Sequence, residues 1–292
     1  MRVRRIPFEH TDITSRGLKT GTPLIEGRGL SLGYRSGPDI LAGIDAEVRS
    51  GEVMCVIGPN GGGKTTLLRA LAGLLRPRQG TVRLLGRSLY GRRSLDRRER
   101  AQMLAVVLTH TTAPAYLRVS ELVELGRLPY RRSRERDIAI VARALEESGV
   151  SHLWNRPVGE LSDGEAQRVM VARALAQEPR ILLLDEPAVH LDPPHQSELF
   201  LLLRSLVAEE TIDSVAVATH HLHLAVHFSD RILVVADGTV IDGIAPTLLA
   251  EGTIEHAFAG DRSRARARPG SELRLDPERG WFVPTDNGRG VW

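Results

Sequence analysis

A glycine-rich stretch at residues 58–66 constrains this chain more than any other part of it. It reads Gly-Pro-Asn-Gly-Gly-Gly-Lys-Thr-Thr and satisfies the phosphate-loop pattern G-x-x-x-x-G-K-[ST]. A short apolar run of buried-strand type precedes it over 52–57, and apolar residues at helical spacing follow it over 66–72. Glycines let the backbone approach a polyphosphate closely, and a helix that starts there points its N-terminus at the same negative charge. The stretch therefore predicts a strand, a loop and a helix that bind a nucleoside triphosphate.

The side chains of this loop predict how the triphosphate is held. Lys64 supplies a positive charge for the β- and γ-phosphates, and the Thr65 hydroxyl is suited to hold Mg²⁺. A chance glycine loop at a helix start is the alternative, and it is disfavoured because both flanks are of the expected type. The predicted binding residues are Asn60, Gly61, Gly62, Gly63, Lys64, Thr65 and Thr66.

The length and the charges of the chain limit the remaining possibilities. A chain of 292 residues has room for one large α/β domain with an additional lobe. Lys19 and Lys64 are the only lysines, so arginine carries nearly all of the positive charge. Arginine clusters at 92–100, 127–136 and 262–268 reflect either GC-rich codon usage or a contact with lipid headgroups or nucleic acid. The single cysteine, Cys55, allows no disulfide within the chain, which is typical of a reducing compartment.

The chain shows no sequence signal for a membrane span. No apolar segment of signal-peptide type follows the basic start at residues 1–5, and no run of 18 apolar residues occurs. We therefore expect a cytoplasmic protein whose contact with a membrane is peripheral.

Hydrophobic periodicity predicts alternating strands and helices with a helical interruption. Residues 1–22 form an extension, 23–110 and 166–245 form two parts of an α/β core, 111–165 form an inserted helical lobe, and 246–292 form a C-terminal helix and hairpin. The predicted strands are 24–34, 40–48, 80–85, 104–108, 181–185, 214–219 and 232–235, with a hairpin over 273–283. The predicted helices are 95–103, 119–125, 134–147, 163–176 and 247–259.

Two carboxylates end the apolar strand at 181–185. Asp185 fits the acidic residue that holds Mg²⁺ opposite a phosphate loop. Glu186 is then the natural general base for an attacking water, the alternative being a helix cap or a surface carboxylate. His220 follows the next predicted strand and is placed to contact the γ-phosphate, unless it is a core histidine. His223 and His227 have metal-pair spacing on a helix, but no carboxylate or cysteine is spaced to complete that site.

A second anion-binding helix start lies at residues 161–165, which read Leu-Ser-Asp-Gly-Glu. With this stretch in place, the chain resembles ABC-type ATPases from Tyr34 to His220, and more weakly to about residue 283. The family has the same phosphate loop, the signature LSGGQ, an acidic strand ending as at Asp185, and a histidine after the next strand. The resemblance implies an α/β fold: a P-loop NTPase core with an antiparallel β subdomain and an inserted α-helical lobe.

The resemblance also implies a head-to-tail dimer in which each ATP is clamped between one phosphate loop and the partner's signature. Tyr34 would stack on the base, and Asp192 would lie in the dimer-contact loop. The residues facing the partner's ATP would be Ser162, Asp163, Gly164 and Glu165. Catalysis is assigned to Glu186, His220 and Lys64.

A finer resemblance is to the ATPases of importers for iron complexes, haem and cobalamin. It depends on residues 119–129 in the helical lobe and on residues 254–258 near the end of the chain. It implies an ATPase at the cytoplasmic face of the cell membrane that works with transmembrane permease subunits, a second ATPase subunit in a homodimer, and a substrate-binding protein. Nucleic acid is not an expected partner. The alternatives are a soluble ABC ATPase acting on nucleic acid or ribosomes, favoured only by the arginine clusters, and the ATPase of an exporter.

Three departures from the family pattern matter for the site. Asp163 replaces a signature glycine, and His221 stands where the family usually has aspartate. Thr109 stands in place of the glutamine that touches Mg²⁺ and links the site to the permease, so Thr109 is a further candidate metal ligand. His110 is the residue that could substitute for that glutamine in part.

Overall fold

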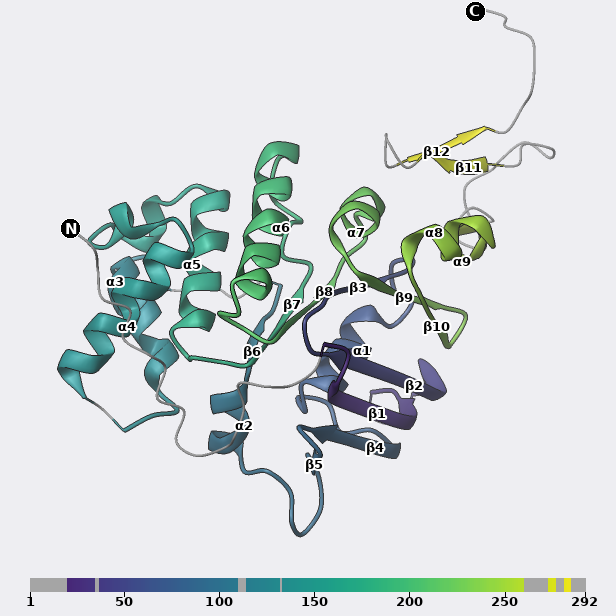
Figure 1. Ribbon diagram of the computed structural model, residues 1–292, viewed down its shortest axis with the longest axis horizontal. Coiled ribbons are helices and arrows are strands. Elements are labelled where there is room, and N and C mark those ends of the chain that lie inside the picture. The colour runs from purple at the N-terminus through teal and green to yellow at the C-terminus, as the bar shows by residue number, and fades with distance from the viewer. Residues whose placement is uncertain are drawn as a thin grey trace, which may run out of the picture.

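The computed structural model describes residues 20–34, 37–109, 114–131, 133–259, 273–276 and 281–284 (Figure 1). In this part of the chain, six strands form a central sheet in the order β10-β9-β3-β8-β7-β6. Neighbouring strands are parallel except for β10, which runs antiparallel to β9. The strands are β3 Val53–Ile57, β6 Leu104–Val107, β7 Ile181–Asp185, β8 Ser214–Ala218, β9 Arg231–Ala236 and β10 Thr239–Gly243.

The inner strands of this sheet are apolar because both of their faces are covered. Every residue of β3, β7 and β8 is buried. Side chains alternate along a strand, so β3 contributes Cys55 to one hydrophobic core and Met54 and Val56 to the other. The burial raises the pKa of the Cys55 thiol to about 12. The phosphate loop thus begins at the end of a strand that is fixed from both sides.

A second, antiparallel sheet covers one face of the central sheet. Its order is β2-β1-β4-β5, and it packs around α1 on the side of Met54 and Val56 (Figure 1). The predicted fold class, an α/β core with an antiparallel subdomain and a helical lobe, is confirmed. The elements of this layer are β1 Pro23–Leu32, β2 Leu41–Arg49, α1 Lys64–Leu71, β4 Gln79–Leu84 and β5 Arg87–Ser88.

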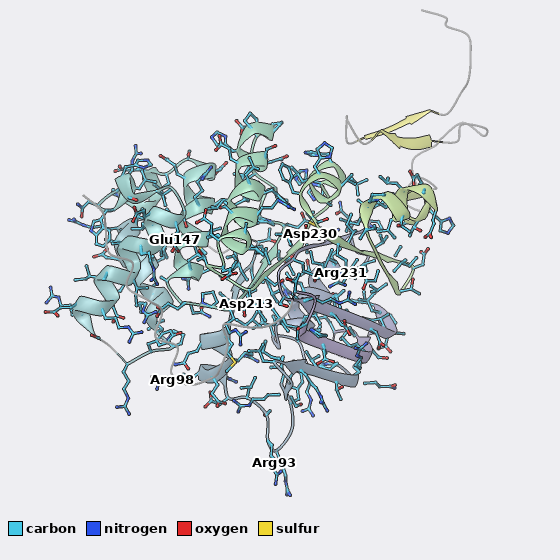
Figure 2. The ribbon with its side chains drawn as sticks, viewed as in Figure 1. Arg93, Arg98, Glu147, Asp213, Asp230 and Arg231 are labelled. Atoms are coloured by element: carbon cyan, nitrogen blue, oxygen red, sulfur yellow. The ribbon has the colours of Figure 1, made fainter. Side chains whose placement is uncertain are left out.

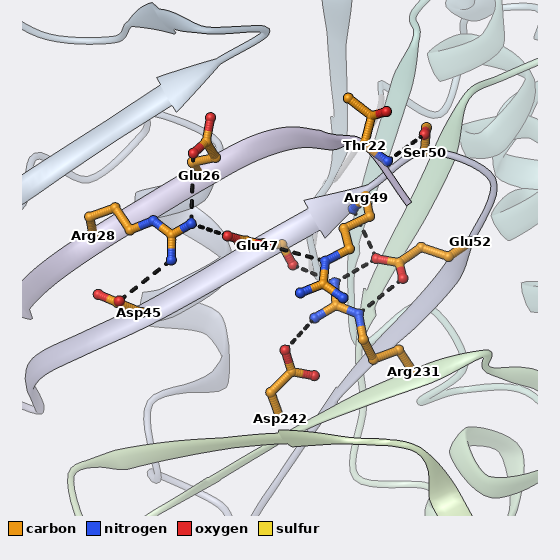
Figure 3. A network of polar contacts seen from close by, with 10 residues as sticks. All are labelled: Thr22, Glu26, Arg28, Asp45, Glu47, Arg49, Ser50, Glu52, Arg231 and Asp242. Atoms are coloured by element: carbon orange, nitrogen blue, oxygen red, sulfur yellow. Dashed lines mark hydrogen bonds and ion pairs between the residues drawn. The ribbon is translucent and has the colours of Figure 1, made fainter. Parts of the chain in front are cut away.

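A network of ion pairs joins the two sheets where β2 leads into β3 (Figure 3). Arg231, buried at the start of β9, donates from Nε to Glu52 Oε2 at 3.0 Å and from Nη1 to Asp242 Oδ2 at 2.7 Å. Its Nη2 donates to the carbonyl of Glu47 at 2.7 Å. A buried charge is tolerated when it is paired and hydrogen-bonded in this way.

Helices α3, α4 and α5 pack on one another beyond β6, at the left of Figure 1. The range expected to be a helical lobe, 111–165, contains α3, α4 and the short 3₁₀ turns, and α5 begins at its end. The elements are α3 Val119–Glu124, η1 Leu125–Arg127, α4 Arg134–Glu147, η2 Ser151–Leu153, η3 Val158–Glu160 and α5 Asp163–Leu175.

One of the arginine clusters lies on a protruding part of the molecule. Arg93 and Arg98 project from the loop and helix below the sheets (Figure 2). The helix is α2 Arg97–Met103, which Asp96 caps by accepting from Glu99 N. Arg98 Nε donates to the carbonyl of Pro129 at 2.6 Å, which links α2 to the lobe.

Two helices cover the far face of the central sheet, and a hairpin adds the edge strand β10. α6 Pro193–Ala208 and α7 Leu222–Phe228 cover that face. Neither α6 nor β10 was assigned from periodicity, although local signals mark both. Asp192 followed by two prolines is a helix start, and Asp237-Gly238, both with positive φ, is a hairpin turn between apolar runs.

The predicted single helix over 247–259 is wrong. The segment forms α8 Ala245–Ala250 and α9 Thr253–Ala259, separated at Gly252, whose φ is +69°. Glycine ends a helix readily in this left-handed region. The predicted terminal hairpin is confirmed: β11 Leu273–Asp276 pairs antiparallel with β12 Trp281–Pro284. None of the helices in the described ranges is long and apolar enough to cross a membrane.

Candidate active site

The phosphate loop joins β3 to α1 in a conformation that requires glycine at two positions. Gly58 has φ +153°, and a Cβ there would lie 2.0 Å from the carbonyl oxygen of Val235. Gly63, at the N-cap of α1, has φ +110°. No side chain among the described residues caps α1, so the first amides of the helix remain for an anion. The exposed loop tip holds Asn60 and Gly61.

Lys64 lies between this loop and the acidic end of β7. Its Nζ donates to the carbonyls of Gly58 at 2.9 Å and Pro59 at 3.3 Å, and lies 3.7 Å from Glu186 Oε1. Burial lowers the pKa of Lys64, while the carboxylates of Glu186 and Asp185 oppose that shift. The ammonium group is therefore held where the loop and the two carboxylates converge.

Thr65 and Asp185 form the second contact between the loop and β7. The Thr65 hydroxyl donates to Asp185 Oδ1 at 2.8 Å, and Asp185 is 2% exposed. A hydroxyl and a carboxylate oxygen side by side are the hard ligands that Mg²⁺ prefers, so these two residues fit such an ion. The Thr109 hydroxyl donates instead to the main-chain carbonyl of Asp185, at 2.7 Å. Thr109 thus supports the strand end, and His110 lies outside the described residues.

Glu186 is held in a strained backbone conformation directly after β7. Its φ is +47°, and its amide donates to the carbonyl of Ala218 at 2.8 Å. Left-handed backbone at a non-glycine residue is costly and is found where the surrounding structure fixes a functional side chain. Glu186 Oε2 accepts from His220 Nδ1 at 2.8 Å. The His220 ring is 42% exposed, so its Nε2 edge remains for a ligand.

The signature helix start is organised by its own residues. Ser162 Oγ accepts from Glu165 N at 3.3 Å, and Glu165 Oε2 accepts from Ser162 N at 2.9 Å. This reciprocal pair forms a capping box at the start of α5, and the hydrogen bond from the Ser162 amide lowers the pKa of Glu165. A Cβ added at Gly164 would lie 3.4 Å from the ring of His195.

A cleft of about 180 Å³ separates this helix from the acidic strand end. Asp163 lines it together with Thr109 and Glu186. The carboxylate that replaces a signature glycine therefore borders a space within its own chain. Gln167 lines the same cleft, and its Nε2 is buried without a hydrogen-bond partner among the described residues. No sequence motif marks Gln167, although it lies four residues after Asp163 on one helix face.

Asp192 caps α6 beside the signature. Its Oδ1 accepts from His195 N at 3.1 Å and contacts His195 Nδ1, and the side-chain hydrogen bond lowers the pKa of Asp192. Tyr34 is 43% exposed, and its hydroxyl accepts from Arg69 Nη1 at 3.4 Å. Both side chains lie outside the cluster of Lys64, Asp185 and Glu186.

The histidines of α7 form no metal centre with any neighbour that the structure describes. Across the described ranges, no three His, Cys, Asp or Glu side chains are arranged to hold a metal ion.

The chain is similar to ATP-binding proteins of transporters. The model of the family described as "ABC transporter" matches residues 41–189. The uncharacterised ABC transporter ATP-binding protein MJ0873 of Methanocaldococcus jannaschii is 38% identical over 222 residues, which is 75% of each chain. The hemin import ATP-binding protein HmuV of Pseudomonas aeruginosa is 40% identical over 84% of this chain and 93% of its own. The cobalamin import ATP-binding protein BtuD of Halobacterium salinarum is 40% identical over 76% of this chain, but only 56% of its own length is covered.

Solved structures share the architecture. CbiO1 of Clostridium perfringens, part of the ABC transporter complex cbiONQ, superposes with a TM-score of 0.69 at 27% identity and covers 83% of this chain and 97% of its own. The dimeric ATP-binding cassette MJ0796 bound to ADP and Pi gives a TM-score of 0.67 at 27% identity, over 76% of this chain and 98% of its own.

Proposed function

Because this chain belongs to the ABC transporter family of ATPases, in which ATP hydrolysis is coupled to transport, we propose that it drives an importer for an iron-siderophore, haem or cobalamin. The support for this ligand class is the similarity to proteins named for hemin, cobalamin and achromobactin transport. ATP hydrolysis by this site is supported by one cluster of side chains. Lys64 Nζ lies 3.7 Å from Glu186 Oε1, and His220 Nδ1 lies 2.8 Å from Glu186 Oε2.

The proposed mechanism assigns one task to each side chain of this cluster. Loop amides and Lys64 bind the β- and γ-phosphates of ATP. Thr65 and Asp185 would hold Mg²⁺, which supplies positive charge to the phosphate oxygens when bound. Glu186 accepts a proton from the water that attacks the γ-phosphorus. His220, held at Nδ1 by Glu186, donates to or accepts from the reacting oxygens through Nε2.

The second half of the site comes from another copy of the chain in this proposal. Tyr34 stacks on the base, and Ser162, Asp163, Gly164 and Glu165 contact the partner's ATP, with Asp192 in the dimer contact. The start of α5 supports this, because Ser162 and Asp163 are exposed there. The homodimer works at the cytoplasmic face of the membrane with permease subunits and a substrate-binding protein. Thr109 or His110 takes the coupling role of the family's glutamine.

Replacing Glu186 with glutamine tests the catalytic assignment. The Glu186→Gln variant keeps the shape of the side chain but cannot accept the proton, so we expect the ATPase rate to fall by about 100-fold or more. ATP binding should survive, and a dimer stabilised by ATP should accumulate. Hydrolysis is measured by phosphate release and dimer formation by size-exclusion chromatography with ATP. Glu251→Gln, at an exposed carboxylate that follows α8 as its C-cap, is the matched control. A Glu186→Gln rate within a few-fold of wild type would show that another group is the base.

A further inference from the structure

The ring of His221 lies against the ring of His220, the residue before it. The two imidazole rings have centroids 4.2 Å apart and an interplanar angle of 33°. At one edge of the His220 ring, Nδ1 is hydrogen-bonded to Glu186 Oε2 at 2.8 Å. One face and one edge of the His220 ring are therefore occupied by His221 and Glu186. A ring that is fixed on a face and an edge has lost most of its rotational freedom about χ2.

His221 is itself held in place by its surroundings. Its amide donates to Thr219 Oγ1 at 3.1 Å, and its carbonyl accepts the Ala225 amide at 3.2 Å at the start of α7. The ring of His223 stands edge-on to it, with centroids 5.9 Å apart. His221 is thus anchored to the strand end and to the helix that begins there.

Two features of His221 are unfavourable for local stability. His221 occupies the N-cap of α7, yet its side chain makes no capping hydrogen bond, a task for which Asp, Asn, Ser and Thr are suited. Its Nε2 is buried and has no hydrogen-bond partner among the described residues. Local features that cost stability are concentrated at functional sites. The ring of His221 does pack on the His220 ring, and the His223 ring stands edge-on to it.

The His221 ring packs as a neutral group at physiological pH. Burial, together with smaller contributions from the neighbouring His220 and His223, lowers the pKa of His221 to about 4. A neutral ring can lie on the His220 ring without charge repulsion. The neutral state favours a packing role for His221 over an electrostatic one.

We propose that His221 is a positioning residue, whose ring packs on His220 and keeps the His220 Nδ1 edge on Glu186. The free Nε2 edge is then directed to the place where the γ-phosphate reacts. The inference rests on the roles proposed above for Glu186 and His220. A misdirected reacting group slows a reaction even where all groups are present, by factors of about ten to a hundred.

Two substitutions at position 221 separate ring packing from the other properties of histidine. His221→Phe keeps a flat ring and removes both nitrogens, and we expect its kcat for ATP hydrolysis to stay within about two-fold of wild type. His221→Ala removes the ring, and we expect kcat to fall about ten-fold with little change in KM for ATP. His221→Leu restores bulk without a flat ring and should resemble His221→Ala, so it replaces that variant if the alanine chain does not fold. Thermal unfolding of each full-length variant checks folding, and His227→Ala, exposed on the same helix, is the matched control.

The comparison with His220→Ala separates this inference from the proposed function. Loss of activity in His220→Ala together with wild-type kcat in His221→Ala overturns the inference alone. Equal impairment of folded His221→Phe and His221→Ala also overturns it, because the ring would then not be the acting feature. Wild-type activity in His220→Ala overturns the proposed role of His220 and the inference with it. Loss in His220→Ala and His221→Ala, with rescue by His221→Phe, supports both.

Discussion

At the scale of single residues, the end of β7 shows how one residue is held through both its main chain and its side chain. The Asp185 carbonyl accepts the Thr109 hydroxyl at 2.7 Å, and its carboxylate accepts the Thr65 hydroxyl at 2.8 Å. Thr65 lies in α1 and Thr109 follows β6, so Asp185 is fixed from two directions. A carboxylate fixed in this way needs little rearrangement to bind a cation.

Removing the Thr109 hydroxyl tests this support. Thr109→Val keeps the branched shape but deletes the donor to the Asp185 carbonyl, so we expect the free energy of unfolding to fall by about 1 kcal/mol. The ATPase rate should fall by a few-fold, because the carboxylate of the same residue becomes less well placed. Urea unfolding and phosphate release measure the two effects, with Thr247→Val, exposed on α8, as the control. Unchanged values for both would mean that Thr109 does not support the site.

At the scale of secondary-structure elements, a buried arginine holds the lobe together. Arg127, in the turn after α3, is 5% exposed. Its Nε donates to Asp137 Oδ1 on α4 at 3.0 Å, and its Nη1 donates to Glu178 Oε2 at 2.8 Å and to the Ala176 carbonyl at 2.7 Å. The guanidinium also lies over the Tyr130 ring, 4.1 Å from the centroid. One side chain thereby connects α3, α4 and the segment that leads from the signature helix α5 to β7.

The loss of this arginine should therefore affect the lobe as a whole. Arg127→Met keeps an unbranched stem but leaves the Asp137 and Glu178 carboxylates buried without their main partner. We expect a loss of about 3 kcal/mol in the free energy of unfolding, since an uncompensated buried charge is costly. Arg143 Nη2 lies 3.4 Å from Glu178 Oε1 and limits the loss at that carboxylate.

Urea denaturation of Arg127→Met beside Arg131→Met measures this effect. Arg131 is exposed in the same connection and serves as the matched control, for which we expect no more than about 0.5 kcal/mol. Equal stability of the two variants would contradict the inferred importance of the buried cluster.

At the scale of the whole molecule, the chain carries two separate helix starts suited to anions. One is the phosphate loop at α1, and the other is the signature at α5, in a different part of the molecule (Figure 1). In the proposed head-to-tail dimer, each ATP uses the first from one copy and the second from the other. Both copies are then needed for each active site.

Mixing two inactive variants tests this division of labour. Lys64→Ala disables the phosphate loop, and Ser162→Arg disables the signature while leaving the ATP affinity of the monomer intact. Each variant alone should be inactive, whereas the mixture should recover activity because a mixed dimer holds about one competent site. ATPase rates across mixing ratios measure the recovery. Absence of recovery, with dimers of each variant shown by light scattering, would argue against shared sites.

The sequence alone determined the features that contiguous residues encode. The phosphate loop, the acidic end of β7 and the helix start at Ser162 each depend on a few neighbouring residues and on the periods of strand and helix. The same local information predicted the α/β class, because continuous apolar runs that alternate with helical patterns favour a buried parallel sheet. It failed over 247–259, where a single glycine interrupts an otherwise helical pattern.

Only the tertiary structure decided where the side chains point and what they touch. Asp163 borders a cleft in its own chain, Thr109 donates to a carbonyl, Arg127 is buried, and the His221 ring packs on His220. None of these contacts follows from spacing along the chain, because each partner's position is set by packing between elements. His220 and Glu186 are 34 residues apart, and only the parallel pairing of β7 with β8 places their strand ends side by side. The chemistry of the site was thus readable from residue types, while its geometry was fixed by the packing of the sheet and its helices.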